Sequence, residues 1–119
     1  MGLEENSEVL DHDLALASVG GDRDFLTEVA GLVQAAWPTL LGEIGQALAA
    51  GDLGAVQKTT RLAKAAARNV SAARAYESAL RLEAAAQAGR LEDAREAGVN
   101  LEREVEKLKA ALAGLGGRD

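Results

Sequence analysis

The sequence contains no cysteine, which excludes disulfide bonds, iron–sulfur clusters and zinc sites with cysteine ligands. It contains one histidine, His12, so mechanisms that require two imidazole groups are excluded as well. Only 3% of the residues are aromatic, namely Phe25, Trp37 and Tyr76. Because 48% of the residues are nevertheless hydrophobic, the core must consist of leucine, valine, isoleucine and alanine, which is typical of helix bundles.

Proline and runs of β-branched residues are also scarce. The chain of 119 residues has a single proline, and its valine, isoleucine and threonine residues are scattered along it. Strands need such residues in runs, so the composition argues against a sheet. A chain of this length fits one domain. We therefore expect a single all-α domain.

Basic residues are rare in the first part of the chain and frequent in the middle. Residues 1–50 carry nine acidic residues and one basic residue, whereas residues 51–81 carry two acidic and six basic ones. The net charge of −6 disfavours binding to nucleic acid or to an anionic membrane surface. The basic middle segment thus lies within an acidic protein.

The N-terminus shows no targeting segment, since no basic residue precedes Arg23 and no long apolar run follows it. The longest uncharged stretch, residues 29–42, is too short to span a bilayer. We therefore expect a cytoplasmic protein without a membrane-spanning helix.

Apolar residues recur at a spacing of three and four over most of the chain, which predicts helices. The predicted elements are a flexible N-terminus at 1–8, a short helix over 10–19, one long helix or two collinear helices from Asp22 to Ala50, helices over 52–69, 72–88 and 91–113, and a flexible C-terminus at 114–119. Connections of two or three residues force the long helices to run antiparallel to their neighbours. Residues 9–113 are thus predicted to form an antiparallel up-down-up-down four-helix bundle, with the short N-terminal helix across one end.

Short polar residues and glycines mark the expected helix boundaries. The predicted N-caps are Asp22, Asp52 and Ser71, and the predicted stops are Gly51 and Gly89. Pro38 is expected to kink the long helix or to restart it, because proline lacks an amide hydrogen and disfavours helical geometry at Trp37.

Six short motifs follow one another along the chain. They are VLD at 9–11, VGGD at 19–22, FL at 25–26, AWPTLL at 36–41, ALAAGD at 47–52 and LE at 82–83. In this order and spacing they resemble the histidine-containing phosphotransfer (HPt) domain of bacterial phosphorelays. The resemblance covers nearly the whole chain. It implies a helical module of two-component signalling whose partners are response-regulator receiver domains or histidine kinases.

The motif that defines the family, Ala-His-x-Leu-Lys-Gly, belongs in the helix predicted over 52–69. A gapless alignment puts Arg61 at the phosphoacceptor histidine, Lys64 at the lysine and Ala65 at the glycine. Phosphotransfer needs a neutral imidazole nitrogen as nucleophile, whereas the arginine guanidinium stays protonated. Since His12 lies far outside the motif, the sequence predicts no phosphotransfer and no enzymatic activity.

His12 lies between Asp11 and Asp13, so its two candidate functional roles are a displaced phosphoacceptor and a metal ligand. Adjacent residues of a helix point in different directions and do not converge on one ion. We expect an exposed histidine in the first turn of the short helix, and neither a metal nor another cofactor.

Four basic residues spaced three, three and four apart form a band on the helix over 52–69. Each alone is explained by a solvated helix face, but the band lies where the resemblance places the docking face for receiver domains, which present clustered carboxylates. The predicted partner-binding residues are Lys58, Arg61, Lys64, Ala65 and Arg68. Binding of nucleic acid by the band is disfavoured because it contains no aromatic residue.

The alternative hypothesis is a structural or dimerisation bundle without a receiver partner. Its basis is the alanine-rich segment 63–79, which allows close helix approach, and a heptad-like seam in the last helix that would pair with a second copy. The seam comprises Leu101, Val105, Leu108 and Leu112. Gly98 interrupts it because glycine has no side chain to pack. Glu83 is an acidic residue near the inner face of its helix. A capping or interhelical hydrogen bond explains this position.

Overall fold

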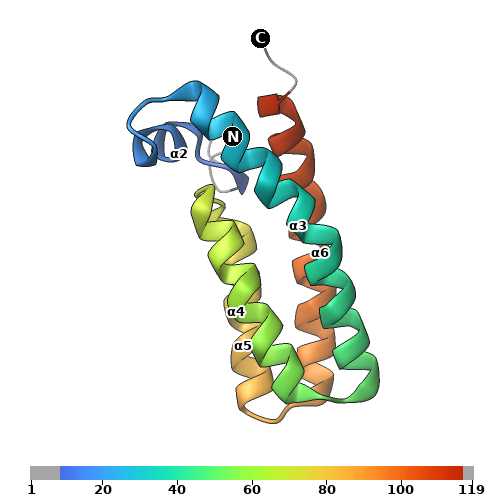
Figure 1. Ribbon diagram of the computed structural model, residues 1–119. Helices are drawn as coiled ribbons and strands as arrows, with labels where there is room; N and C mark the ends of the chain where they lie inside the picture. The colour runs from blue at the N-terminus through green and yellow to red at the C-terminus, as the bar shows by residue number, and fades with distance from the viewer. Residues whose placement is uncertain (1–8, 117–119) are drawn as a thin grey trace.

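Five helices make up most of residues 9–116, the part of the chain that the computed structural model describes (Figure 1). They are α2 (His12–Ser18), α3 (Arg23–Ala50), α4 (Leu53–Asn69), α5 (Ala73–Gln87) and α6 (Leu91–Gly116). Helices α3 to α6 run up and down in turn as a four-helix bundle, and α2 lies at one end of it. The predicted all-α architecture is confirmed.

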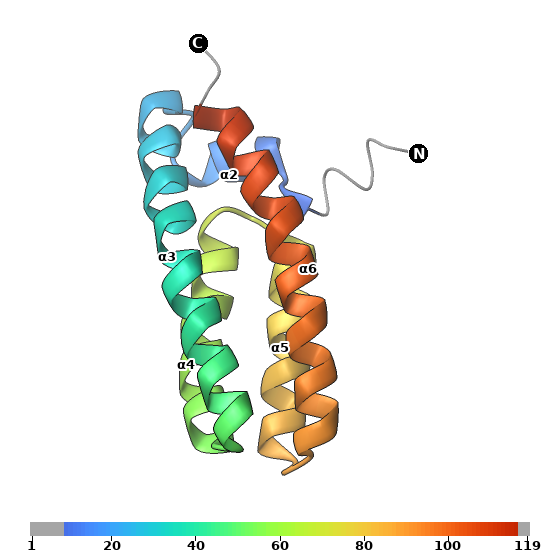
Figure 2. The same ribbon diagram turned by 90° about the vertical axis from the view of Figure 1, so that its right-hand side faces the viewer.

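Each long helix of the bundle packs against two others. Contacts join α3 to α4, α4 to α5, α5 to α6, and α6 back to α3. Helices α3 and α4 therefore form one side of the bundle, and α5 and α6 form the opposite side (Figure 2). This arrangement decides which surfaces of α4, α5 and α6 are open to solvent.

The core consists of the apolar stripes that the spacing predicted. Trp37 is fully buried near the middle of α3, and it packs in a cluster with aliphatic side chains from the other helices. The seam of α6 is buried in the same cluster, with its four members, Leu101, Val105, Leu108 and Leu112, at most 1% exposed. The expectation that this seam pairs with a second copy is therefore wrong, because the bundle itself occupies it.

The capping prediction is confirmed at two helix starts and wrong at a third. The carboxylates of Asp22 and Asp52 accept hydrogen bonds from the backbone N–H groups of Phe25 and Ala55, respectively. Gly51 ends α3 in the left-handed conformation at φ 72°, which glycine adopts at little cost.

Ser71 does not cap α5. It lies in the turn before the helix with φ 57°, and Ala72 occupies the N-cap position without a side-chain hydrogen bond. The backbone carbonyl of Ser71 instead accepts the N–H of Asp11 at 3.1 Å. This bond ties the segment before α2 to the turn between α4 and α5, where Leu10 is buried.

Pro38 neither ends nor restarts α3, which is continuous from Arg23 to Ala50. Proline removes one backbone hydrogen bond from a helix, but Trp37 and Leu40 on either side are buried in the core. Their packing holds both halves in one helix, while Pro38 faces solvent. The predicted restart is therefore wrong.

The ends of the bundle differ in part from the predicted boundaries. Helix α2 begins at His12 rather than at residue 10, because the Asp11 carboxylate accepts the N–H of Leu14 and caps it there. Helix α6 continues to Gly116, past the boundary predicted at 113. The expected flexible N-terminus at 1–8 and the last three residues of the expected flexible C-terminus lie outside the described residues. Between residues 9 and 116, none of the helices combines the length and apolar character that a membrane span requires.

Candidate partner-binding site on helix α4

Helix α4 has an apolar face and a basic face, as the spacing predicted. Val56, Ala63 and Ala67 are buried against the bundle, and so is Thr60, whose hydroxyl donates to the carbonyl of Val56 at 2.8 Å. The predicted binding residues lie on the other faces. Lys58, Arg61, Ala65 and Arg68 are exposed, while Lys64 is half-buried.

A carboxylate from α5 lies beneath the centre of the basic band. Glu83 is 8% exposed, and its Oε1 lies 2.6 Å from Nζ of Lys64. Its Oε2 lies 3.5 Å from Nε of Arg61. The expected interhelical interaction of Glu83 is thus an ion pair with two cations of α4, and it holds both basic side chains in place.

The two cations differ in how far they remain open to solvent. The side chain of Lys64 is 22% exposed, whereas that of Arg61 is 64% exposed. A guanidinium carries five N–H donors, and the contact with Glu83 engages the Nε side. Arg61 therefore presents most of its donor groups outward, at the position where the resemblance places the phosphoacceptor.

An exposed apolar patch adjoins Arg61 on α4. Leu62 is exposed although it is a large hydrophobic residue, and Ala65, one turn further on, is exposed as well. Residues three apart are neighbours on a helix surface. The surface around Arg61 thus combines positive charge with a small apolar area, a combination suited to contact with another protein.

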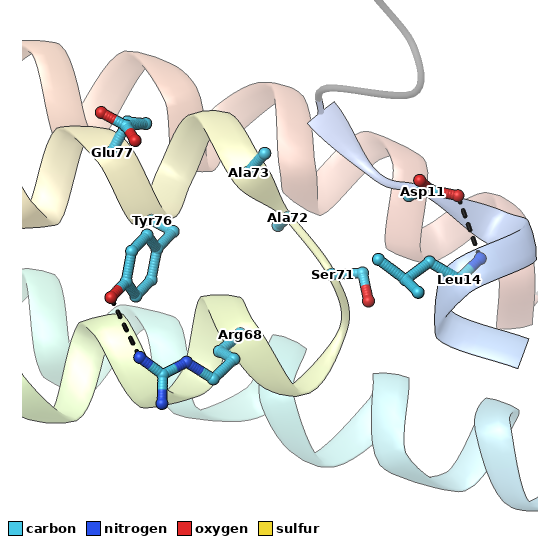
Figure 3. A pocket seen from close by; sticks show the side chains of 8 residues that line it. All are labelled: Asp11, Leu14, Arg68, Ser71, Ala72, Ala73, Tyr76 and Glu77. Atoms are coloured by element: carbon cyan, nitrogen blue, oxygen red, sulfur yellow. Dashed lines mark hydrogen bonds between the residues drawn. The ribbon is translucent and has the colours of Figure 1, made fainter. Parts of the chain in front are cut away.

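Arg68 is held against Tyr76 of α5 at the end of the band. Its Nη2 donates to the Tyr76 hydroxyl at 2.9 Å, and its guanidinium carbon lies 5.2 Å from the ring centroid. Figure 3 shows this pair at one side of a pocket of about 400 Å³ between α4, α5 and α2. Leu14 and Asp11 line the pocket from the α2 side.

In the sequence, Tyr76 is notable only as one of three aromatic residues. Its pairing with Arg68 depends on the turn at residues 70–72, which turns α5 back beside α4. Such a contact becomes predictable only once the two helices are known to be antiparallel neighbours. The pocket extends the basic band towards α2 and gives it an apolar edge.

His12 is the first residue of α2, and its side chain is exposed, as expected. Within residues 9–116, no three histidine, aspartate or glutamate side chains are grouped so that they would hold a metal ion. The candidate site is therefore the basic surface of α4 with Glu83 beneath it.

No protein-family model matches the sequence, and no curated protein matches it significantly. Among solved structures, the chain is similar to the HPT domain from the Hpt sensor hybrid histidine kinase from Shewanella, with a TM-score of 0.81 and 18% sequence identity. The similarity covers 91% of this chain and 93% of that one. The chain therefore has the fold of an HPt domain.

Proposed function

We propose that this chain is an HPt-like module of two-component signalling that binds a receiver domain, or another acidic signalling protein, without transferring phosphate. The proposal rests above all on the cluster of Arg61, Lys64 and Glu83. In this cluster an arginine stands at the position that the resemblance assigns to the phosphoacceptor.

The chemistry of Arg61 is opposed to phosphotransfer. A guanidinium has no lone pair available at neutral pH, so it neither attacks an aspartyl phosphate nor releases one. It is instead a strong donor to carboxylates, with which it forms two parallel hydrogen bonds. An exposed arginine at this place favours binding over catalysis.

The surroundings of Arg61 suit an acidic partner. Lys58 and Arg68 extend the positive charge along α4, and Leu62 and Ala65 add an apolar contact area. Glu83 compensates one of the positive charges and contacts the Nε side of Arg61, which leaves the other donors of the guanidinium open to a partner. In complex with a receiver domain, Arg61 would enter the carboxylate pocket where these domains hold a divalent cation.

The decisive experiment is titration of the purified protein against receiver domains from the same genome, in the presence and absence of magnesium. We expect one of them to bind, and Arg61→Ala to weaken that binding by about tenfold or more. A charge-assisted hydrogen bond that is desolvated in an interface is worth about 1.5 to 3 kcal/mol, and 1.4 kcal/mol corresponds to tenfold in affinity. Magnesium is expected to weaken binding, because it competes for the same carboxylates.

Arg90→Ala is the matched control, since Arg90 is an exposed arginine at the turn between α5 and α6. It should leave the affinity unchanged. Absence of binding to every receiver domain would contradict the proposed function. Binding that is indifferent to magnesium would contradict the role of Arg61. The proposed function also implies a cytoplasmic location, where receiver domains act.

A further inference from the structure

A second basic region lies in a groove between α5 and α6. The groove has a volume of about 370 Å³, within the range of small-molecule sites. Residues spaced three and four apart on each helix line it. They are Arg74, Ser78 and Arg81 from α5, and Asn100, Arg103 and Lys107 from α6.

The groove holds more positive charge than its own carboxylate compensates. Glu104 also lines it, and its Oε1 lies 3.0 Å from Nε of Arg74, while its Oε2 lies 3.8 Å from Nζ of Lys107. Within residues 9–116, neither Arg81 nor Arg103 has a carboxylate within ion-pair distance. Four cations and one carboxylate leave a formal charge of +3 in a chain whose net charge is −6.

The hydrogen-bonding groups of the groove are mostly donors. Arginine and lysine side chains only donate, and the Ser78 hydroxyl and the Asn100 amide add further donors. The carboxylate of Glu104, the strongest acceptor present, already faces Arg74 and Lys107. A ligand that fits such a lining is an anion with several oxygen acceptors, and arginine binds phosphate groups with two parallel hydrogen bonds.

The groove is separate from the basic surface of α4. Helix α5 rotates by about 100° per residue, so Arg81 lies on the side of α5 away from Glu83, which faces α4. In Figure 2 the α5 and α6 side of the bundle lies opposite the side formed by α3 and α4. A ligand can therefore bind in the groove without contacting the basic surface of α4.

We propose that the groove between α5 and α6 binds a small phosphate-bearing anion. Two phosphate groups are the best match to the lining, because cations stand on both walls of the groove. Arg81 and Arg103 are the principal ligands, since they come from opposite walls. Ser78 and Asn100 contribute neutral donors between them.

The test is titration of the protein with inorganic pyrophosphate, orthophosphate and glycerol phosphate at constant ionic strength, followed by nuclear magnetic resonance of the backbone amides. We expect saturable shifts that centre on Ser78 and Asn100, with pyrophosphate bound most tightly. Preference for glycerol phosphate over orthophosphate would identify a phosphate ester rather than the free ion as the ligand. The double variant Arg81→Gln/Arg103→Gln is expected to weaken pyrophosphate binding by about tenfold or more.

The matched control is Arg23→Gln/Arg90→Gln, which removes two exposed charges outside the groove and gives the same net charge. It should bind pyrophosphate as the unchanged protein does. Equal weakening in both double variants would show attraction by net charge alone and would overturn the proposal. Absence of saturable shifts in the unchanged protein would by itself overturn the proposal.

Discussion

Replacing Trp37 with alanine is expected to lower the free energy of unfolding by about 3 to 5 kcal/mol. The side chain is fully buried in the core cluster. Phe25 is exposed and Tyr76 lies at the pocket beside Arg68, so neither of the other aromatic residues fills the space. Domains of this size have a total stability of about 5 to 15 kcal/mol, so the loss is a large part of the whole.

Trp37→Phe tests whether the loss of stability follows the buried volume that is removed. The indole Nε1 is buried and donates to no group within residues 9–116. Phenylalanine therefore removes volume without breaking a hydrogen bond, and we expect less than half of the loss seen with alanine. Both variants are measured by chemical denaturation followed by far-ultraviolet circular dichroism, because the unchanged protein alone retains tryptophan fluorescence. Equal losses would show that packing volume is not what Trp37 contributes.

Replacing Glu83 with glutamine is expected to lower the free energy of unfolding by about 1 to 3 kcal/mol. Glutamine keeps the shape of the side chain but removes the negative charge that faces Lys64 and Arg61. Most of the cost arises at Lys64, whose half-buried ammonium loses its counter-charge, whereas Arg61 remains well solvated. A double-mutant cycle with Lys64→Met measures the coupling directly, which we expect to lie at about 0.5 to 3 kcal/mol.

Glu92→Gln is the control for burial. Glu92 pairs with Arg95 at 2.9 Å, a distance similar to that of the Glu83 and Lys64 pair, but its side chain is 84% exposed. Exposed pairs contribute about 1 kcal/mol or less. A loss at Glu83 no larger than at Glu92 would contradict the structural role of Glu83.

Under the proposed function, the same change is expected to have the opposite effect on partner binding. Glu83→Gln leaves the charges of Arg61 and Lys64 uncompensated, so an acidic partner should bind the less stable protein more tightly. A loss of stability accompanied by a gain in affinity distinguishes this site from an ordinary structural ion pair.

The helices were predictable because their signals are local. The apolar spacing, the aspartate caps and Gly51 each act within a few residues, and the structure shows each of them where it was expected. The outcome at Pro38 and Ser71 depended on distant parts of the chain. The burial of Trp37 keeps α3 continuous, and Ser71 lies in a turn with φ 57° that also accepts a hydrogen bond from the backbone N–H of Asp11.

The candidate site was predictable only on one helix. The spacing on α4 places Lys58, Arg61 and Arg68 on the exposed side without knowledge of any neighbour. The ion pairs of Glu83 and the groove between α5 and α6 depend on how adjacent helices are rotated against each other. The sequence does contain one signal for the groove, because Arg74, Ser78 and Arg81 share one side of α5.

The order of contacts around the bundle has a consequence for how the chain folds. Three of the four interfaces between long helices join neighbours in the chain, and the fourth joins α3 to α6. Proteins dominated by such local contacts fold within microseconds to milliseconds, since little loop entropy is lost before contacts form. The closure of α6 onto α3 bridges the greatest separation in sequence, so this interface is expected to form last.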